Sequence, residues 1–393
     1  MLFQRLAFSL QPFLMYQYLV FMKPRQRKIS AIVSRLLEWF PRNARDLPWR
    51  QTRDPYAIWV SEIMLQQTQV KTVVPYWHRW MGELPTIKSV ASARLERIHK
   101  LWEGLGYYTR ARNLQKAAQT IVDRHGGKFP RRFEDVLELQ GIGRYTAGAI
   151  CSIAFDQPTP ILDGNVVRVL TRLFGISGNP REPKVSKELW RLSTGFVLTA
   201  AAFQNTASSA APRSTLHAPR FCSLLNQSLM ELGALICTPK LPQCSVCPVV
   251  SCCAAFQRGR VHELPRPATR LRAVPRRVLA LVVQRRGRFL VRQRPAGVVN
   301  AHLWEFPNTE VALNAPRLRQ AARLLLGVVP TRLDRLCSIK HSITRYRITL
   351  EVFRAHFNHA AKFAPDGARW LNPFQLSRLP FASAHKRILA LVN

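Results

Sequence analysis

Apolar residues recur at three- and four-residue spacing over most of the first half of the chain, from Ile29 to Trp190. This spacing is that of helices with one buried stripe. The pattern breaks at glycines, as at Gly126-Gly127 and between Gly141 and Gly143, and glycines end helices readily. No strand pair stands out in this stretch. We therefore expect a mainly α-helical module over residues 29–256, in which helical periodicity returns at Leu224 to Ile236.

Two segments depart from the helical pattern. Residues Ser193 to Arg220 are rich in Ala, Ser and Thr, which predicts a flexible insert over residues 193–220. Residues 1–28 form an N-terminal extension, in which the apolar run Leu10 to Met22 is too short and too interrupted for a membrane helix. Its basic cluster follows the run, whereas a signal peptide has basic residues first. We expect Met22 to be the initiator, with an organelle-targeting leader as the alternative.

The last third of the chain has a different pattern. Residues 257–277 are rich in Pro and Arg and are interpreted as a linker. Two short β-rich runs, Val278 to Val283 and Arg288 to Gln293, then flank a turn-like segment. A helical run at Leu318 to Leu326 and a further strand at Arg345 to Phe353 follow. Residues 278–393 are therefore predicted to form an α+β domain.

Charge adds a class of partner to this picture. The chain of 393 residues carries 59 Lys and Arg against 22 Asp and Glu, a formal net charge of +37. Such a surplus creates a positive potential that attracts polyanions, nucleic acid above all. An anionic membrane surface and an arginine-rich composition are the alternatives. Charge alone does not specify a sequence or a lesion.

A cysteine cluster follows the helical module. Cys237, Cys244, Cys247 and Cys253 have the spacing C-x6-C-x2-C-x5-C. Four soft ligands so close in sequence predict a metal centre, either an iron-sulfur cluster or tetrahedral zinc, and the spacing alone does not separate the two. The adjacent Cys252 is an alternative fourth ligand. Nothing in the sequence indicates secretion, so disulfides are a poor explanation.

The segment from Leu139 to Ala147 carries a Gly-Ile-Gly turn, and Asp163 follows Tyr145 at a spacing of 18 residues. Backbone N–H groups at Gly141 and Gly143 can approach a phosphate closely, and a helix starting near Arg144 adds its positive N-terminal end. The segment is interpreted as a DNA-binding hairpin beside a carboxylate. An ordinary joint between two helices is the alternative interpretation.

A second carboxyl group lies in a strongly apolar run. Glu62 is flanked by Trp59, Val60, Ile63, Met64 and Leu65. Apolar surroundings raise the pKa of a carboxyl group and keep it protonated near neutral pH, as a general acid requires. A half-buried partner in a salt bridge is the alternative role.

Taken together, these motifs resemble helix-hairpin-helix DNA glycosylases of the endonuclease III superfamily, in its adenine glycosylase (MutY) branch. The second domain resembles the Nudix-like domain of that branch, including Leu303 to Pro307. Residues 311–333 contain no Asp or Glu, so the metal-dependent hydrolysis of true Nudix enzymes is not expected. The resemblance favours one four-iron four-sulfur cluster over zinc. It implies a monomer that acts on double-stranded DNA without a membrane, in the cytoplasm at the nucleoid if bacterial.

The resemblance also assigns catalytic roles. Glu62 protonates the adenine, and ionised Asp163 stabilises the oxocarbenium-like sugar as the glycosidic bond breaks. Tyr145 stands where bifunctional members carry a nucleophilic lysine, which implies a monofunctional enzyme that leaves an abasic site. Asn165 and Tyr145 are expected to hold Asp163 and the sugar in place, with plain packing residues as the alternative interpretation.

Further residues match DNA-binding positions of the family. By this match, Gln67 and Tyr107 are expected to intercalate next to the extruded base. The adenine pocket is expected to be lined by Arg45, Arg50 and Gln227. Lys340 and His341 stand where the family reads 8-oxoguanine, although Lys340 replaces the usual serine. The expected reaction is excision of adenine opposite 8-oxoguanine or guanine. The alternatives are a thymine-mismatch or pyrimidine-lesion glycosylase and a non-catalytic DNA-binding protein.

Overall fold

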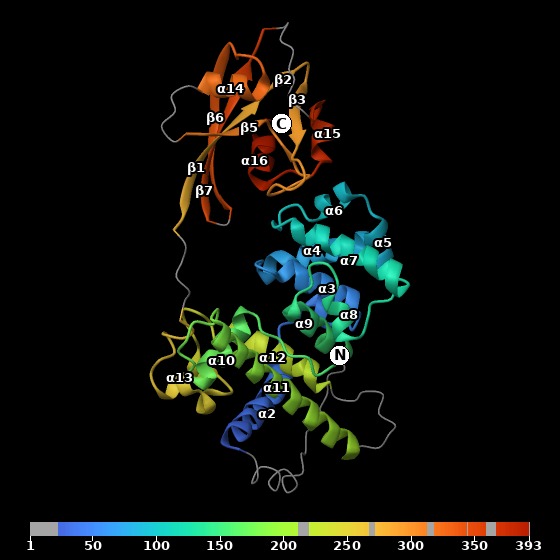
Figure 1. Cartoon of the computed structure of the whole chain (residues 1–393), viewed down its shortest axis with the longest axis vertical. Coiled ribbons are helices and arrows are strands. Elements are labelled where there is room, and N and C mark those ends of the chain that lie inside the picture. The colour runs from blue at the N-terminus through green and yellow to red at the C-terminus, as the bar shows by residue number, and fades with distance from the viewer. Residues whose placement is uncertain are drawn as a thin grey trace. The chain divides into compact units, whose positions relative to one another are not determined.

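The computed structural model describes residues 23–210, 220–266, 272–312, 318–343, 345–358 and 367–392. The chain divides into two compact units (Figure 1). The first comprises Met1–Glu62 and Phe129–Ala268, and the second comprises Ile63–Lys128 and Thr269–Asn393. The predicted boundaries of the extension, helical module, linker and second domain remain predictions. The apolar run from Leu10 to Met22 lies outside the described residues.

The predicted helical character of the first half of the chain is confirmed. The first unit contains α2 (Pro24–Asn43), the 3-10 turn η1 (Pro48–Arg50), most of α3 (Pro55–Leu65), α8 (Phe133–Leu137), α9 (Arg144–Phe155), α10 (Gly164–Phe174), α11 (Pro183–Ala210), α12 (Phe221–Leu235), the 3-10 turns η2 (Cys244–Val246) and η3 (Val250–Cys252), and α13 (Ala254–Gln257). The helical part of the second unit contains α4 (Val70–Glu83), α5 (Ile87–Ser92), α6 (Leu95–Leu101) and α7 (Thr109–His125).

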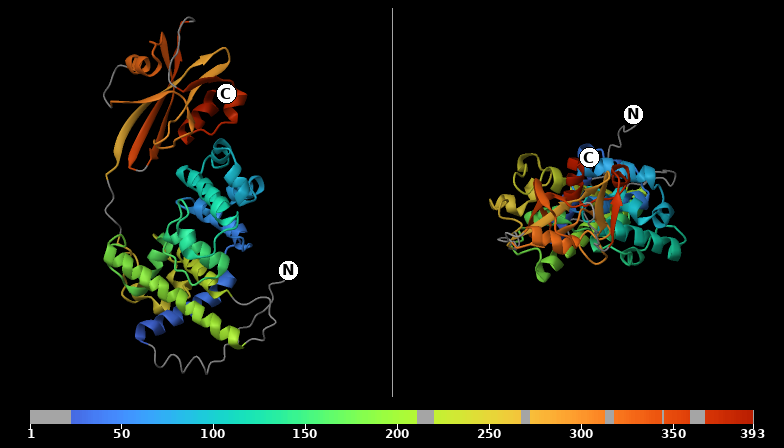
Figure 2. Two further views of the ribbon diagram at one scale, coloured as in Figure 1. Left: turned by 45° about the vertical axis from the view of Figure 1, so that its right-hand side comes forward. Right: turned by 90° about the horizontal axis from the view of Figure 1, so that it is seen from above.

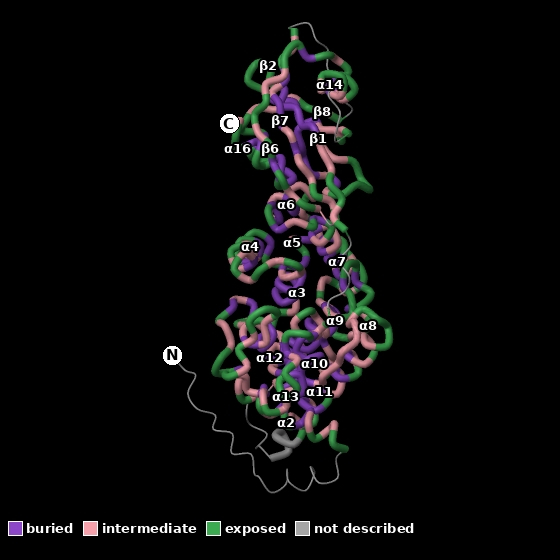
Figure 3. Tube along the Cα trace, turned by 90° about the vertical axis from the view of Figure 1, so that its left-hand side faces the viewer, coloured by how far each residue is buried: buried purple, intermediate pink, exposed green. Residues whose placement is uncertain are grey.

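The core of the first unit forms where α2, α10 and α11 pack against α12. Figure 3 shows the buried stretches of these helices. Ile32 of α2, Leu170 of α10, Phe196 of α11 and Leu229 of α12 are all fully buried. Each burial of this kind contributes roughly 1.5–3 kcal/mol. The sequence periodicity identified the stripes of α2, α10 and α12 correctly, whereas Phe196 lies in the segment that was predicted to be a flexible insert.

The predicted flexible insert is wrong over its first part. Residues Ser193 to Ala210 continue α11, and Phe196, Val197 and Ala200 are fully buried against the neighbouring helices. Alanine is a strong helix former, so a segment rich in alanine and poor in glycine is helical where its apolar positions find a partner. Residues 211–219 of the predicted insert lie outside the described residues.

Two helix ends of the first unit position the chemistry described below. Helix α9 begins directly after Gly143, and the preceding turn is closed by the N–H of Ile142, which donates to the carbonyl of Leu139 at 3.0 Å. Gly141 has a φ of +81°, in the left-handed region that favours glycine. Helix α10 begins after Asp163, whose side chain caps it.

The helical part of the second unit packs around two tryptophans. Trp80 of α4 and Trp102 at the end of α6 are fully buried and meet edge to face, with 5.5 Å between their ring centroids. Helices α5 and α7 also pack together. Glu103 then connects this part to the strand-rich part, because its carboxylate accepts from the N–H of Phe381 at 2.9 Å and from Lys386 at 2.6 Å.

The strand-rich part of the second unit has two sheets. The first has the order β5-β1-β7-β6, in which β1 (Val274–Val282) is parallel to β7 (Tyr346–His356) and antiparallel to β5 (Asn308–Val311), and β6 (Arg332–Ile343) is antiparallel to β7. In the second, β3 (Arg288–Gln293) pairs antiparallel with β2 (Gln284–Arg285), β4 (Trp304–Glu305) and β8 (Ala368–Leu371).

Helices cover this strand-rich part on two sides (Figure 2). Leu279 and Leu281 of β1 pack in one core with α14 (Leu318–Leu326). Ala280 and Val282 belong to the other core, to which α16 (Ser383–Val392) contributes. Because side chains alternate along a strand, one strand supplies both cores. The short α15 (Pro373–Ser377) begins at an Asn372 capping box.

The predicted α+β character of this part is confirmed. The expected runs coincide with β1, β3, α14 and β7. Strand β6 and helix α16 were not expected. Strand β1 begins at Val274, inside the predicted linker, and residues 267–271 of that linker lie outside the described residues. None of the helices in the described ranges combines the length and apolarity needed to cross a membrane.

Candidate active site

Glu62 lies inside the first unit on α3 and is only 5% exposed. Its neighbours on the helix, Trp59 and Val60, are fully buried, so water is largely excluded from this carboxyl group. The hydroxyl of Tyr145, one residue into α9, donates to Oε2 of Glu62 at 2.8 Å and approaches Sδ of Met230 at 3.3 Å. Two residues that are 83 positions apart thus share one hydrogen bond.

Asp163 is fixed at the N-terminus of α10. Its Oδ1 accepts from the N–H of Val166 at 2.7 Å, and its Oδ2 accepts from Nδ2 of Asn165 at 2.9 Å. The side chain of Asn165 accepts in turn from Arg168 at 2.8 Å, and Arg168 also donates to the carbonyl of Gly233. The carboxylate therefore has a defined orientation, because both of its oxygens and its amide neighbour are held.

The environment raises the pKa of both carboxyl groups. Burial and the negative charge of Asp163 together raise the pKa of Glu62 to about 7, although the Tyr145 hydroxyl and Arg50 oppose the shift. Burial also raises the pKa of Asp163, against the hydrogen bonds from Val166 and Asn165. Burial and the neighbouring acids hold the pKa of Tyr145 well above 10, so its hydroxyl stays neutral. Of the two carboxyl groups, that of Glu62 is the one that can carry a proton near neutral pH.

A third acid, Glu231, was missed by the sequence reasoning. It is fully buried on α12, and its carboxylate pairs with Arg45 at 2.7 Å and with Arg50 at 2.8 Å. The two guanidinium groups lower its pKa to about 2 against the effect of burial. The only signal in the sequence was an acid within the apolar run Leu229 to Ile236.

Arg45 and Arg50, expected to line the adenine pocket, are thus brought together by Glu231. The guanidinium of Arg50 also stacks on the ring of Phe40, 5.2 Å from its centroid. Gln227 is half-buried one helical turn before Glu231, and its Nε2 donates to Oγ of Ser223 at 3.1 Å. The structure therefore places Gln227 on the same stretch of α12 but records its hydrogen bond within that helix.

The glycines of the predicted hairpin lie at the surface. Gly141 and Gly143 are both exposed, and a Cβ added at Gly143 would meet no atom within 4 Å. Gly143 is the residue before the first turn of α9, whose free N–H groups suit an anion. Tyr145 leaves the same turn toward Glu62. The hairpin thus joins an open backbone surface to the buried acid.

Gln67 and Tyr107 lie in the second unit at the tips of two loops. Both are exposed, and both have a positive φ, 59° for Gln67 and 46° for Tyr107. Tyr107 is 52% exposed, which is unusual for an aromatic side chain. The two residues expected to intercalate are therefore available to a partner.

Lys340 and His341 are neighbours on β6 and lie opposite Thr349 and Ile348 of β7. Successive side chains on a strand point to opposite faces. Lys340 is exposed, whereas His341 is half-buried and burial lowers its pKa. The structure therefore does not bring these two predicted lesion-reading residues to one face. At the end of the same hairpin, the guanidinium groups of Arg276 and Arg345 lie over the ring of Tyr346, at 3.7 and 5.3 Å.

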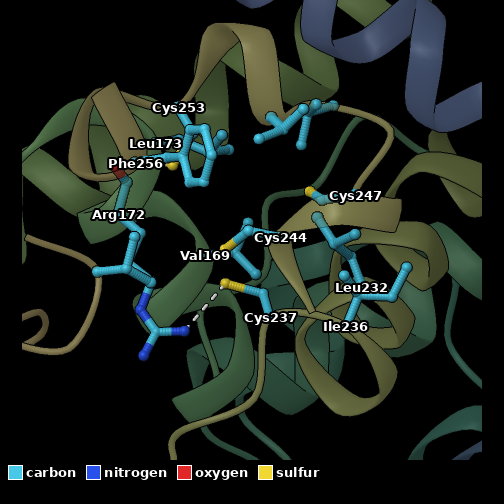
Figure 4. A pocket seen from close by; sticks show the side chains of 13 residues that line it. Val169, Arg172, Leu173, Leu232, Ile236, Cys237, Cys244, Cys247, Cys253 and Phe256 are labelled. Carbon is cyan, nitrogen blue, oxygen red and sulfur yellow. Dashed lines mark hydrogen bonds between the residues drawn. The ribbon is translucent and has the colours of Figure 1, made fainter. Parts of the chain in front are cut away.

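The four predicted cysteine ligands lie around one pocket of the first unit (Figure 4). The wall of the pocket includes Cys237, Cys244, Cys247 and Cys253. Arg172 lies beside it, with Nη1 3.3 Å from Sγ of Cys237. Cys252 is not part of the wall and lies near Arg35. This arrangement favours Cys253 over Cys252 as the fourth ligand.

The four thiols of this pocket are donors of the type that bind soft metal centres. Apolar side chains such as Leu173, Ile236 and Val261 form the rest of the wall, and burial raises the pKa of Cys247 to about 12 in the absence of any metal charge. A cationic centre reverses that effect, because it stabilises thiolates. In the described part of the chain, no three His, Cys, Asp or Glu side chains are grouped closely enough to hold a metal ion.

Two family models match the chain. Residues 60–194 match the HhH-GPD superfamily base excision DNA repair protein family, and residues 278–391 match the NUDIX domain. A thermostable thymine-DNA glycosylase of known structure is similar to 60% of this chain and to 100% of its own chain, with 28% identity and a TM-score of 0.50. These matches cover both predicted domains.

Curated relatives extend over nearly the whole chain. The adenine DNA glycosylase of Mus musculus is 37% identical over 92% of this chain and 78% of its own length. The adenine DNA glycosylase of Homo sapiens is 35% identical over 92% of this chain and 74% of its own length. Similarity of this extent, together with the buried carboxyl group of Glu62 and the half-buried one of Asp163 at the start of α10, identifies the chain as an enzyme of the adenine DNA glycosylase family.

Proposed function

We propose that this glycosylase excises adenine mispaired with 8-oxoguanine or guanine from duplex DNA and leaves an abasic site. The observation that carries the proposal is the buried carboxyl group of Glu62, whose pKa of about 7 is close to neutral pH. A general acid is most effective when its pKa is close to the operating pH. The adjacent hydroxyl of Tyr145 at 2.8 Å keeps the carboxyl group in one orientation.

In the proposed mechanism Glu62 donates its proton to a ring nitrogen of the extruded adenine, which turns a poor leaving group into a good one. Positive charge then develops on the deoxyribose. Asp163, ionised and held by Val166 and Asn165, stabilises that charge, and a water molecule completes the hydrolysis. Glu62 accepts one hydrogen bond, from a neutral phenol, whereas Asp163 accepts two, from Val166 and Asn165. This difference is consistent with a protonated Glu62 and an ionised Asp163.

The same geometry supports a monofunctional reaction. Tyr145 points its hydroxyl at Glu62 and has a pKa well above 10. A neutral phenol does not form a Schiff base with the sugar, a step that needs an amine. We therefore expect no strand cleavage until alkali is added.

We further propose that the cysteine pocket holds one four-iron four-sulfur cluster through Cys237, Cys244, Cys247 and Cys253. When bound, the cluster would link four thiolates of the loop between α12 and α13 and so hold that loop in one conformation, which we expect to help dock DNA. Arg172, which donates to the carbonyl of Thr238 at 2.8 Å, holds the same loop from α10. Iron and acid-labile sulfide analysis with visible absorption distinguishes this centre from zinc, and stoichiometric zinc without iron would overturn the assignment.

The partner in this proposal is a DNA duplex bound by a protein monomer. The net charge of +37 supports phosphate binding. Reading of the opposite base is assigned to the hairpin of β6 and β7, where Lys340 is exposed. Since Lys340 and His341 leave opposite faces of β6, we expect only one of them to contact that base.

Single-turnover excision tests the proposal. The full-length protein is mixed with duplexes containing adenine opposite 8-oxoguanine, adenine opposite guanine, thymine opposite guanine, or an oxidised pyrimidine. We expect adenine excision, fastest opposite 8-oxoguanine, and its loss in Glu62→Gln and Asp163→Asn. Glu38→Gln is the matched control, because Glu38 is exposed on α2 and pairs only loosely with Arg42 at 3.9 Å. Excision that survives both active-site substitutions would overturn the mechanism, and faster release of thymine would overturn the substrate.

A further inference from the structure

Two exposed loops of the second unit share an unusual backbone conformation. One follows α3 and has Gln67 at its tip, and the other precedes α7 and has Tyr107 at its tip. Both tip residues have a positive φ, 59° and 46°. A side chain other than glycine in this region is strained by about 1–3 kcal/mol. Such a conformation persists only where the surrounding structure holds it.

A single side chain connects the two loops. The guanidinium of Arg110, in the first turn of α7, donates from Nη1 to the carbonyls of Ile63 at 2.8 Å, Met64 at 3.0 Å and Gln66 at 2.6 Å. Its Nη2 donates to the carbonyls of Leu105 at 3.0 Å and Gly106 at 3.2 Å. The first group of acceptors leads into the Gln67 loop, and the second leads into the Tyr107 loop.

Ring contacts fix the same guanidinium from its faces. It lies 5.4 Å from the ring centroid of Trp102, which is fully buried, and 5.7 Å from that of Tyr107. These are cation–π distances. Arg110 is thus held by the core on one side and touches a tip residue directly on the other.

The charge of Arg110 is not neutralised locally. Among the described residues no carboxylate forms an ion pair with it, and its acceptors are five backbone carbonyls and the hydroxyl of Thr68, at 3.5 Å. A half-buried cation without an anionic partner is costly to keep. Its fork of donors, however, satisfies several carbonyls at once in a fixed geometry that a lysine cannot reproduce.

We propose that Arg110 is a positioning residue that joins the Gln67 and Tyr107 loops into one preorganised wedge for extruding the target base. This inference rests on the proposed function and on the expectation, drawn from the sequence, that the two tip residues enter the duplex beside the extruded adenine. Opening a base pair and unstacking its base costs a few kcal/mol. If both loops already have the conformation that enters the duplex, no binding free energy is needed to order them. The free energy required to extrude the base is then lower.

A double-mutant cycle tests the proposal. Extrusion is followed by the fluorescence of 2-aminopurine placed opposite 8-oxoguanine, and excision is followed separately on adenine. The variants are Arg110→Lys, which keeps the charge and the stem, Arg110→Met, Tyr107→Ala and the double variant Arg110→Lys with Tyr107→Ala. Arg97→Lys is the matched control, because Arg97 is exposed on the preceding helix α6 and pairs with Glu83 at 2.7 Å.

We expect Arg110→Lys to slow extrusion about tenfold, the effect of a coupling of about 1.4 kcal/mol, while the control is unchanged. In the double variant the effects do not add, because Arg110 acts through the loop that Tyr107→Ala has already disabled. Circular dichroism melting identifies variants that fail to fold. If Arg110→Met does not fold, the milder Arg110→Lys decides.

Two results would overturn the proposal: unchanged extrusion in Arg110→Lys, or full additivity with Tyr107→Ala, as a general loss of stability would give. Its failure remains distinguishable from failure of the proposed function. Absence of adenine excision by the unaltered protein refutes that function, whereas the extrusion cycle needs no chemistry and still reports on the wedge.

Discussion

Two buried glutamates of the first unit have opposite protonation behaviour. Glu62 on α3 is 5% exposed, and burial raises its pKa to about 7. Glu231 on α12 is 0% exposed, yet its pKa falls to about 2. Burial opposes the charged form at both positions. The difference lies in the partners, a neutral phenol for Glu62 and two guanidinium groups for Glu231.

One protein interior thus holds a reactive acid and a structural anion that are both influenced by the same arginine. Arg50 belongs to both environments, since it pairs with Glu231 and its charge also lowers the pKa of Glu62. Because Glu231 pairs with Arg50, part of the positive charge near Glu62 is neutralised. We therefore expect Glu231 to favour the protonated form of Glu62.

The largest effect is expected when Glu62 loses its ability to titrate. Glu62→Gln keeps the size and a hydrogen-bond acceptor for Tyr145 but removes the proton donor, so excision should slow by about 10²- to 10⁴-fold. Single-turnover rates measure the change. The free energy of unfolding should stay the same or rise, because a buried ionisable group is removed. A rate within threefold of the unaltered protein would show that Glu62 is not the acid.

Removing the other glutamate should damage the fold more than the chemistry. Glu231→Gln leaves Arg45 and Arg50 without their anion, and breaking a buried pair in this way costs about 3–5 kcal/mol. Urea unfolding measures the loss. Arg42→Gln serves as control, since Arg42 is exposed and lies 3.9 Å from its partner. Equal stability of Glu231→Gln and the unaltered protein would contradict the structural role assigned to the ion pairs of Glu231.

The pH dependence of the rate follows from the pKa of Glu62. A group that must be protonated, with a pKa of about 7, predicts a single-turnover rate that is constant below that pH and falls about tenfold per pH unit above it. Rates measured from pH 5.5 to 9 on bound substrate test this. A rate that rises over the same range would indicate that the ionised form of Glu62 is required.

Stability should depend on pH in opposite senses for the two glutamates. The pKa of Glu62 is raised on folding, so its contribution is present below about pH 4.5 and lost as the pH rises through about 7. The pKa of Glu231 is lowered, so its contribution is present above about pH 4.5 and lost as the pH falls through about 2. The stability difference between Glu231→Gln and the unaltered protein should therefore shrink in acid, and a constant difference would contradict this.

The smallest effect is expected at Tyr145. Tyr145→Phe removes the hydroxyl that lowers the pKa of Glu62, a hydrogen bond with a net contribution of about 1 kcal/mol. The alkaline fall of the rate should move to higher pH, while the plateau changes only a few-fold. A shift to lower pH would show that the hydroxyl favours the protonated form instead.

Much of the fold could be predicted from local sequence. The helical stripes, the α14 segment and strands β1, β3 and β7 follow from periodicity and from turn residues. The helical continuation through Ser193 to Ala210 was missed because its composition resembles a loop and only its packing against α2 and α12 reveals the buried face. Strand β6 was missed because its alternation is interrupted by charges.

The site was predicted less completely than the fold. Glu62, Asp163, Tyr145 and the cysteines carry motifs, and the structure brings Glu62 to Tyr145 and the four cysteines to one pocket. Glu231 and Arg110 carry no motif. Their importance comes from partners that lie 181 and 47 positions away in the chain. Lys340 and His341 are adjacent in sequence and yet face opposite sides of β6.

The sequence by itself determined which residues carry chemistry, because carboxyl groups in apolar runs, glycine turns and closely spaced cysteines are local patterns. Only the tertiary structure decided which of two buried glutamates keeps its proton, since that depends on whether a phenol or two guanidinium groups arrive from distant helices. Electrostatic interactions act through space rather than along the chain. The sequence therefore identifies Glu62 as a candidate acid, and the fold sets its pKa.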